Sequence, residues 1–380
     1  MIDLQESRKK IDEVDRKLVE LFEYRMQIAI DVAEYKRSVG KPIYDPAREE
    51  EKLDALRQIT QNEFNKKAVS DLFSQIMSMS RRLQYMMFDN DQGLGFVRID
   101  GIASDKDTKV VFFGEKGSYT EQAMLEYFNA PVHGIPKETF AGVMQAIKDQ
   151  EADYGVLPIE NSVTGTLSDI FDLLAEYDNY IIGEHVIKIE HNLWGLPGST
   201  MSDITKVYSH RQGLLQCSQF LKQLTDMKQI DGGSTAGSAR RILEDQDITQ
   251  AAIASKRAGE YYGLQLLKSS IHNEDHNSTK FIIISNKRIY ASDAKRISIC
   301  FVLPHKSGSL YHTLSHFIYN NINMTRIESR PITGKAFEYR FFVDIEGNLD
   351  MPSIKNALHC ISEEAIEMKI LGSFAPAIAK

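Results

Sequence analysis

The sequence predicts a multidomain protein built of three units that differ in secondary-structure class. Residues 1–90 carry apolar residues at helical spacing with few Gly or Pro residues, which is typical of an all-α unit. From residue 108 short apolar strands alternate with helices, and from residue 295 the pattern becomes strand–helix–strand–strand–helix–strand. A chain of 380 residues has room for two or three such domains.

The N-terminal unit is expected to contain three helices. The first is predicted from about Asp3 to Ser38, with Gly40 near its C-cap and Pro42 preventing its continuation. Further helices are predicted near 46–60 and 65–88. About 33 residues at 1.5 Å each give a first helix roughly 50 Å long, which exceeds a small domain. We therefore expect this helix to pack against a second copy of the chain.

Charged and polar side chains of these helices form a candidate anion site. Arg25 and Lys36 are eleven residues apart and therefore share one helix face, roughly 16 Å apart along the axis. Arg8 faces elsewhere, so in a two-fold dimer it would reach the pocket of the partner subunit. Other candidates are Asp45, Arg48 and Glu49 at the start of the second helix, and Ser80 and Gln84 on one face of the third. The alternative is that these groups are simply solvated, as most helix charges are.

These eight residues fall where the all-helical chorismate mutase family places its site residues, so the unit resembles that family. The resemblance implies an intertwined dimer that converts chorismate to prephenate by a pericyclic rearrangement. Arg8 of one chain and Arg25 of the other would clamp the two substrate carboxylates. Lys36 and Gln84 would donate hydrogen bonds to the ether oxygen, and Glu49 completes the catalytic set. Such a reaction requires no nucleophile, metal or cofactor.

A polar, Gly-punctuated stretch at 91–107 is predicted to link the helical unit to a central domain at 108–287. The alternation of strands and helices there favours an α/β domain with a largely parallel sheet. Its organising stretch is Tyr154–Thr166, in which Pro158 is expected to end a strand. Polar residues follow at Glu160 to Thr164, and a helix beginning near Thr166 would make this an anion site. Ordinary loop and cap chemistry is the alternative.

The central domain resembles prephenate dehydratases. The matching motifs are GEKGSYT at 114–120, PIENS at 158–162, SH at 209–210, QC at 216–217, STA at 234–236 and NSTKF at 277–281. The resemblance implies two α/β lobes of the type II periplasmic-binding-protein kind, with the site between them. The implied substrate-binding residues are Ser118, Glu160, Asn161, Ser162, His210, Gln216, Ser234, Thr235, Thr279, Lys280 and Phe281.

The implied reaction removes carbon dioxide and water from prephenate and yields phenylpyruvate. Aromatisation drives it, so the enzyme need only assist the departing hydroxyl with a hydrogen-bond donor. Thr279 is our first choice for that donor. Glu160 is either a proton donor or a helix-end cap, and His210 is either a donor or structural. Lys280 stands where the family usually has Arg, which keeps the charge but loses the planar fork.

The C-terminal unit, residues 295–373, has the βαββαβ order of a ferredoxin-like sandwich and resembles an ACT regulatory domain. Glu328, Ser329 and Arg330, followed by a proline, match a phenylalanine-sensing signature. Gly308 and Leu310 match a second signature, with Ser309 in place of the usual Ala. The resemblance implies L-phenylalanine as an allosteric effector. His312 and His316 have the spacing of metal ligands, but no third ligand is evident, so we expect no metal.

Composition limits the partners and the compartment. A formal net charge of -8 argues against nonspecific binding to nucleic acid or to an anionic membrane. Three scattered cysteines predict neither disulfides nor a zinc motif, and no apolar run is long enough for a membrane span. We expect a cytoplasmic homodimer or higher homo-oligomer with chorismate mutase and prephenate dehydratase activities and feedback inhibition by phenylalanine. The alternatives are a non-catalytic small-molecule sensor and an enzyme that retains one of the two activities.

Overall fold

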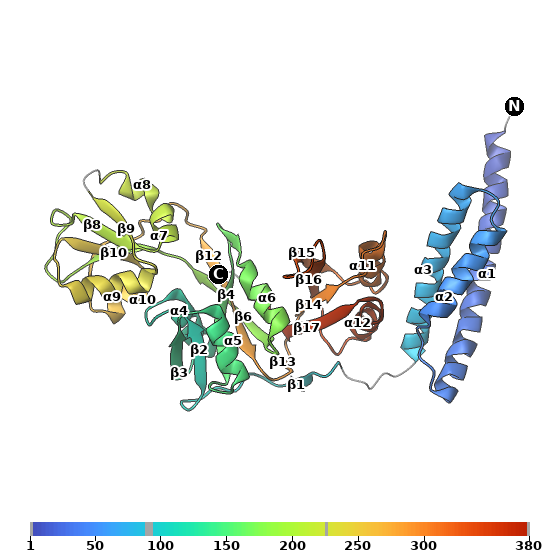
Figure 1. Ribbon diagram of the computed structural model, residues 1–380, viewed down its shortest axis with the longest axis horizontal. Coiled ribbons are helices and arrows are strands. Elements are labelled where there is room, and N and C mark those ends of the chain that lie inside the picture. The colour runs from blue at the N-terminus through green and yellow to red at the C-terminus, as the bar shows by residue number, and fades with distance from the viewer. Residues whose placement is uncertain (1–2, 88–93, 225–226, 378–380) are drawn as a thin grey trace.

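The structure is a computed structural model that describes residues 3–87, 94–224 and 227–377. Its helical unit consists of α1 (Leu4–Val39), α2 (Pro46–Ile59) and α3 (Glu63–Met87) and lies at one end of the molecule (Figure 1). Gly40 ends α1 in the left-handed conformation at φ 67°, and Asp45 accepts a hydrogen bond from the first turn of α2. The three predicted helices and the Gly40 C-cap are thus confirmed.

The first lobe of the central domain is a sheet flanked by α4 (Tyr119–Phe128), α5 (Phe140–Lys148) and α6 (Ser168–Glu176). Its strands, in spatial order, are β3 (His133–Lys137), β2 (Lys109–Phe113), β4 (Tyr154–Asn161), β12 (Ser278–Ser285) and β6 (Tyr180–Lys188). The prediction of a largely parallel sheet is wrong here, because β12 returns from the second lobe and pairs antiparallel with both β4 and β6.

Pro158 lies inside β4 and does not end it, contrary to the prediction. The β4–β12 register shifts between Lys280 and Phe281, and Phe281 lies opposite Pro158. Such a shift lets a strand continue past a residue that has no N–H to donate. The following helix, α6, begins at Ser168 after the two-residue strand β5 (Gly165–Thr166), close to its predicted start.

The chain enters the second lobe after β6 and leaves it before β12, so two segments connect the lobes. The second sheet has the order β11 (Gln265–Lys268), β7 (Asn192–Gly195), β10 (Gln250–Ala254), β8 (Lys206–Ser209) and β9 (Lys228–Asp231). Its helices are α7 (Arg211–Gln216), α8 (Ser218–Leu221), α9 (Thr235–Asp245) and α10 (Lys256–Tyr261). The predicted pair of α/β lobes is confirmed.

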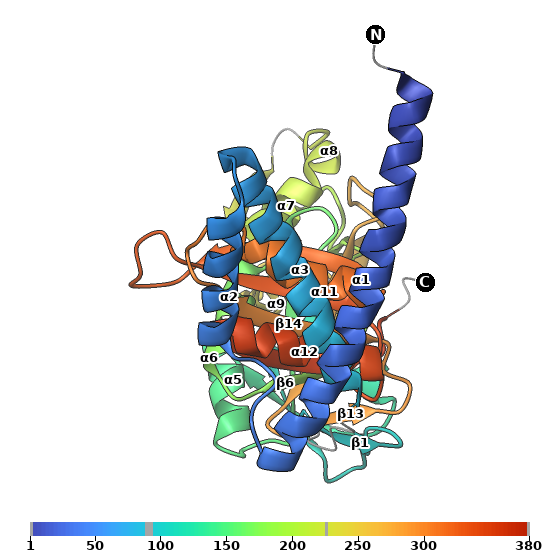
Figure 2. The same cartoon turned by 90° about the vertical axis from the view of Figure 1, so that its right-hand side faces the viewer.

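The C-terminal unit has the predicted βαββαβ order. Its elements are β14 (Arg296–Val302), α11 (Ser309–Tyr319), β15 (Met324–Pro331), β16 (Tyr339–Glu346), α12 (Pro352–Glu364) and β17 (Glu367–Phe374). The sheet order β15-β16-β14-β17 is that of a ferredoxin-like sandwich. Helix α12 packs against α3 of the helical unit (Figure 2).

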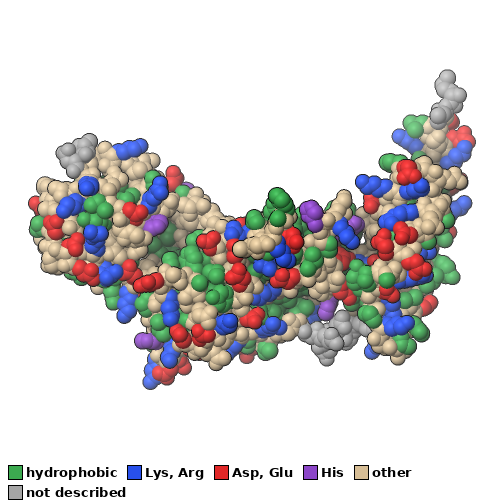
Figure 3. All heavy atoms as spheres, in the orientation of Figure 1, with side chains coloured by type: hydrophobic (Ala, Val, Ile, Leu, Met, Phe, Trp, Pro, Cys, Tyr) green, Lys and Arg blue, Asp and Glu red, His purple; other side chains and the backbone are tan. Residues whose placement is uncertain are grey.

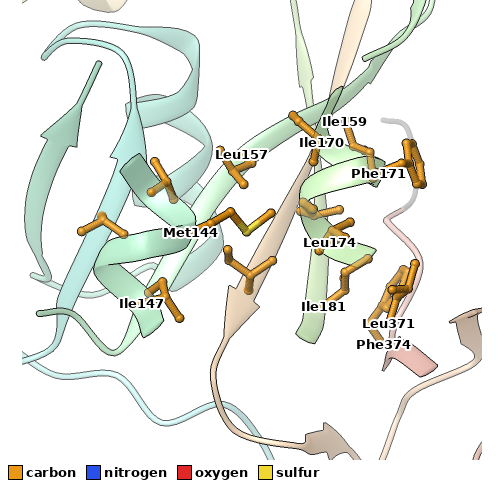
Figure 4. Packing of buried hydrophobic residues seen from close by; sticks show 14 of the residues in the cluster. Met144, Ile147, Leu157, Ile159, Ile170, Phe171, Leu174, Ile181, Leu371 and Phe374 are labelled. Carbon is orange, nitrogen blue, oxygen red and sulfur yellow. The ribbon is translucent and has the colours of Figure 1, made fainter. Parts of the chain in front are cut away.

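Strand β17 also joins the sheet of the central domain, because Gly372 pairs with Ile181 of β6. A Cβ at Gly372 would lie 2.0 Å from the Ile181 carbonyl oxygen, so only glycine permits this approach. Beside the junction, Leu371 and Phe374 share a core with Phe171 and Ile181 of the central domain (Figure 4). The two domains therefore share one ten-stranded sheet and part of one core.

Part of the predicted linker is ordered. Within it, β1 (Val97–Ile99) pairs parallel with β13 (Ile289–Ala291), and Leu94 and Phe96 pack on the C-terminal core. Residues 91–93 of the predicted linker lie outside the described residues. Across the described ranges, no helix combines the length and the apolar character that a membrane crossing needs.

Candidate active sites

The helical unit gathers cationic and polar side chains where its three helices meet. Arg25 of α1 donates a hydrogen bond to Ser80 of α3, and Lys36 Nζ donates to the Ile43 carbonyl at 2.5 Å. Burial lowers the pKa of Arg25 and of Lys36, while the Glu49 carboxylate opposes the shift at both. The structure therefore brings Arg25 and Lys36 together, as their spacing predicted, and adds Glu49 and Ser80, as the family resemblance implied.

Gln84 lies one turn after Ser80 on α3 and is only 6% exposed. Its side-chain Oε1 is buried and has no hydrogen-bond partner in the part of the chain that the structure describes. This buried amide oxygen can accept a hydrogen bond from a ligand, since buried polar groups normally find partners.

The other three predicted residues of the helical unit are exposed. Arg48 is exposed and pairs with Glu51 at 2.7 Å, so its predicted contact with the substrate is not supported within this chain. Asp45 is exposed and caps α2 by accepting from the Arg48 N–H. Arg8 is exposed on α1, in keeping with its predicted orientation away from the pocket of its own chain.

Sequence reasoning missed Arg81, which lies beside Glu49. Arg81 is 5% exposed, and its Nη1 lies 2.5 Å from both Glu49 oxygens. Its Nη2 lies 2.6 Å from Glu364 of the C-terminal unit. No local pattern signals this role, because burial of Arg81 depends on a segment more than 280 residues away.

The central domain places Asn161 and Thr279 in contact at the ends of β4 and β12. Asn161 Nδ2 donates to Thr279 Oγ1 at 2.9 Å and to Asn277 Oδ1 at 2.8 Å. Asn161 Oδ1 accepts from the N–H groups of Val163 and Thr164, both at 3.0 Å, which fixes the amide orientation. Because Thr279 Oγ1 accepts from Asn161, the Thr279 proton remains available to donate to another group.

Glu160 and Lys280 form an ion pair next to this contact, with 3.2 Å between Lys280 Nζ and Glu160 Oε2. The helix-cap alternative for Glu160 is wrong, since this residue lies within β4. Lys280 also lies 4.0 Å from Glu184, which in turn is 3.0 Å from Arg296 of β14. Burial raises the pKa of Glu184, and the two cations oppose that shift.

Gln216 belongs to a second polar group at the boundary between the lobes. Its Oε1 lies 2.8 Å from His191 Nε2, and His191 Nδ1 lies 3.2 Å from the Tyr119 hydroxyl. Burial lowers the pKa of His191, with the Gln216 hydrogen bond opposing it. Sequence reasoning missed His191 and Tyr119, although His191 falls in the segment that crosses between the lobes. A cavity of about 200 Å³ is lined by Gln216, Asn277 and Val163, so it connects this group to the Asn161 turn.

Several other predicted substrate-binding residues have structural tasks. Ser118, His210 and Ser234 cap the N-termini of α4, α7 and α9, and Thr235 is the first residue of α9. Ser162 joins β4 to the turn before β12, since its hydroxyl donates to the His276 carbonyl at 3.0 Å. Phe281 is 1% exposed and packs in the core, so its predicted contact with the substrate is wrong.

The lobes are tied together by ion pairs from the loop at 114–120 and from α4. Glu115 binds Arg240 of α9, and Glu121 binds Arg257 of α10, each at 2.8 Å. On the face shown in Figure 3, acidic and basic side chains are interspersed over both lobes. Neither sign of charge dominates that face.

The predicted effector residues fall into two groups. Gly308 caps α11 at φ 87°, and Leu310 lines a neighbouring pocket of about 360 Å³. Glu328 pairs with Arg326 at 3.1 Å, Ser329 is exposed, and Arg330 binds Asp172 of α6 with Nε at 2.9 Å. None of these three residues of β15 lines the Leu310 pocket.

Comparison with known proteins assigns both enzyme units. The chorismate mutase type II family model matches residues 7–85, and the prephenate dehydratase family model matches residues 110–289. A bifunctional chorismate mutase/prephenate dehydratase of Aquifex aeolicus is 32% identical over 100% of this chain and 99% of its own length.

Two solved structures resemble the part of the chain beyond the helical unit. A prephenate dehydratase from Arthrobacter aurescens in complex with L-Phe is 29% identical at a TM-score of 0.65, covering 71% of this chain and 90% of that chain. GqqA, described as a novel type of quorum quenching acylase, is 30% identical at the same TM-score of 0.65, covering 71% of this chain and 98% of that chain. Because similar folds can carry different activities, the assignment rests on relatives that span the whole chain.

Proposed function

Because the chain belongs to the family of bifunctional chorismate mutase/prephenate dehydratases, we propose that each of its two activities has its own site, at the pockets around Lys36 and Thr279. The enzyme rearranges chorismate to prephenate and then decarboxylates and dehydrates prephenate to phenylpyruvate, a step of phenylalanine biosynthesis. The observation that carries the two-site proposal is the gathering of Arg25, Lys36 and Glu49 in the helical unit, far along the chain from Thr279. Its three cysteines are buried and free, which supports our placing it in the cytoplasm.

At the mutase site, catalysis consists of holding the substrate in its reactive conformation and stabilising charge in the transition state. Arg25 binds one carboxylate of chorismate, and an arginine from a second chain binds the other, which folds the flexible ether side chain into its reactive shape. Lys36 and Gln84 donate hydrogen bonds to the ether oxygen, where negative charge grows in the transition state. Glu49 accepts a hydrogen bond from a substrate hydroxyl, because a carboxylate can only accept.

A homodimer supplies the second arginine. Helix α1 exposes an apolar seam with seven-residue periodicity, each member at least 40% exposed: Leu4, Ile11, Leu18, Val32 and Val39, with Val14, Leu21, Ile28 and Tyr35 as the companion set. Such a seam is typical of a coiled coil, and Arg8 lies at the edge of it, where side chains face the partner helix. Arg8 of the partner subunit would thus complete the pocket around Arg25.

This shared site predicts complementation between inactive variants. Arg8→Ala and Arg25→Ala should each lose mutase activity, since each leaves one substrate carboxylate unbound. After exchange of equal amounts, about half of the dimers are mixed and each has one of its two pockets with both arginines, so about a quarter of wild-type activity should return. The measurement is chorismate consumption after mixing, with exchange followed by differently labelled subunits. Proven exchange without any recovery would contradict a shared pocket, and mixing Arg25→Ala with itself is the control.

In the dehydratase cleft, Thr279 assists departure of the ring hydroxyl. The Asn161 amide donates to Thr279 Oγ1, which leaves the Thr279 proton for the leaving hydroxyl. Lys280, paired with Glu160, offers a cation for a prephenate carboxylate at the same strand ends. Gln216, held by His191, positions the substrate from the side of the second lobe.

The C-terminal unit is an ACT domain that binds L-phenylalanine. The neighbouring prephenate dehydratase from Arthrobacter aurescens has L-Phe bound, and Leu310 lines a pocket beside the Gly308 turn. Strand β15 touches the dehydratase domain directly, because Arg326 donates to Thr166 at 2.9 Å and Arg330 binds Asp172. Binding that repositions β15 would therefore shift the cleft toward a less active state.

One assay tests the proposed function as a whole. The enzyme is incubated with chorismate, and chorismate, prephenate and phenylpyruvate are followed separately with and without L-phenylalanine. We expect chorismate loss, then phenylpyruvate formation, and a lower rate of phenylpyruvate formation when phenylalanine is present. Absence of both conversions would favour the sensor alternative, and loss of one would leave a single activity. An unchanged rate with phenylalanine would refute the regulatory assignment alone.

A further inference from the structure

Helix α12 of the C-terminal unit packs against α3 beside Glu49 of the proposed mutase site. Ile43 and Tyr85 of the helical unit form a small buried cluster with Cys360 of α12. The Tyr85 hydroxyl binds Glu363, and the Tyr85 ring stacks on His359 with 6.0 Å between centroids. Because apolar, hydrogen-bonded and aromatic contacts coincide here, the two units form a fitted interface.

Arg81 sits at the centre of that interface and contacts both units. Its guanidinium binds Glu49 of the mutase pocket on one side and Glu364 of α12 on the other. The ring of Tyr44 covers it with 4.8 Å to the centroid, and Glu364 is itself held by His316 at 2.9 Å. The planar fork of arginine suits it to hold two carboxylates at fixed positions.

We propose that Arg81 is a positioning residue of the mutase reaction and that the C-terminal unit acts on this reaction by holding Arg81 through Glu364. The proposal rests on the proposed role of Glu49 as a substrate contact. Arg81 fixes the Glu49 carboxylate in the pocket. Glu364 draws part of the guanidinium charge toward α12, so that Glu49 stays available to accept from the substrate hydroxyl. Without Glu364, the Arg81 guanidinium binds Glu49 alone. It then competes with the substrate hydroxyl for the Glu49 oxygens.

Three variants test this on the full-length enzyme. Arg81→Met should lower mutase kcat about tenfold with KM for chorismate changed less than about twofold, because orientation rather than affinity is lost. Glu364→Gln should lower mutase kcat about threefold. The double variant should match Arg81→Met alone, because Glu364 acts through Arg81. Dehydratase activity on added prephenate should stay at the wild-type level in all three, which also shows that they fold.

Arg57→Met is the matched control. Arg57 lines the same interdomain cleft as Arg81 but binds Glu50 and Asp54, so its loss should leave mutase kcat unchanged. Wild-type mutase kcat in Arg81→Met would overturn the proposal while leaving the proposed function intact, whereas an inactive wild type would overturn the function itself. If Glu364→Gln lowers mutase kcat by the same factor in the wild type and in Arg81→Met, Glu364 does not act through Arg81. If Arg81→Met does not fold, the Glu364→Gln variant alone tests the proposal. An unchanged mutase kcat in Glu364→Gln would then refute it.

Discussion

Replacing Thr279 by Ala is expected to lower phenylpyruvate formation at least about 100-fold while chorismate consumption continues at the wild-type rate. The hydroxyl at this position accepts from the Asn161 amide at 2.9 Å and so presents its proton to the leaving group. Alanine removes that proton and leaves no other hydroxyl bound to Asn161 Nδ2. Prephenate should then accumulate, which separate quantification of the three compounds would reveal.

The matched variant is Thr279→Ser, which keeps the hydroxyl and loses only a methyl group. We expect it to retain at least about a tenth of the wild-type dehydratase rate, since a serine hydroxyl can make the same hydrogen bonds. Equal loss of both activities in Thr279→Ala would contradict two separate sites. Full dehydratase activity in Thr279→Ala would remove this residue from the mechanism.

The largest expected effect on stability comes from Gly372→Ala. The added methyl group would lie 2.0 Å from the Ile181 carbonyl oxygen and 2.7 Å from its nitrogen, and neither backbone atom can move without breaking the shared sheet. The C-terminal unit should therefore separate from β6, with a loss of about 3 kcal/mol in the free energy of unfolding. Denaturant unfolding measured by circular dichroism would show the shift.

Gly101→Ala is the control for this substitution. No atom lies within 4 Å of a Cβ built at Gly101, so the unfolding midpoint of the Gly101→Ala variant should match that of the wild type. A Gly372→Ala midpoint equal to that of Gly101→Ala would mean that the sheets are not joined at Gly372. If the junction also carries regulation, Gly372→Ala should respond less to phenylalanine in the chorismate assay.

Much of the local structure could be predicted, because short-range chemistry decides it. Gly40 adopts the left-handed conformation that ends α1, and Asp45 with Pro46 starts α2, as their positions in the sequence indicate. The βαββαβ order of the C-terminal unit followed from hydrophobic periodicity alone. The cluster of Arg25 and Lys36 followed from helix geometry, since eleven residues return to nearly the same face.

Strand pairing was predicted less well, because it depends on which segments meet. Pro158 indicates a strand end by local rules, yet β4 continues through it because β12 shifts register opposite this residue. The same strand makes the sheet mixed by entering between β4 and β6. Phe281 belongs to a recognisable motif, but its face of β12 turns into the core, and only the register decides that.

The sequence by itself determined the order of the three units, their helix ends and the residue types that suit a dianion and a departing hydroxyl. The helix ends and the pattern of elements depend on residues that are close together in the sequence. Only the tertiary structure decided that Arg81 binds Glu49, that Glu364 holds Arg81, and that Gly372 joins two sheets. Those contacts link residues far apart in the chain, and their geometry depends on how whole domains pack.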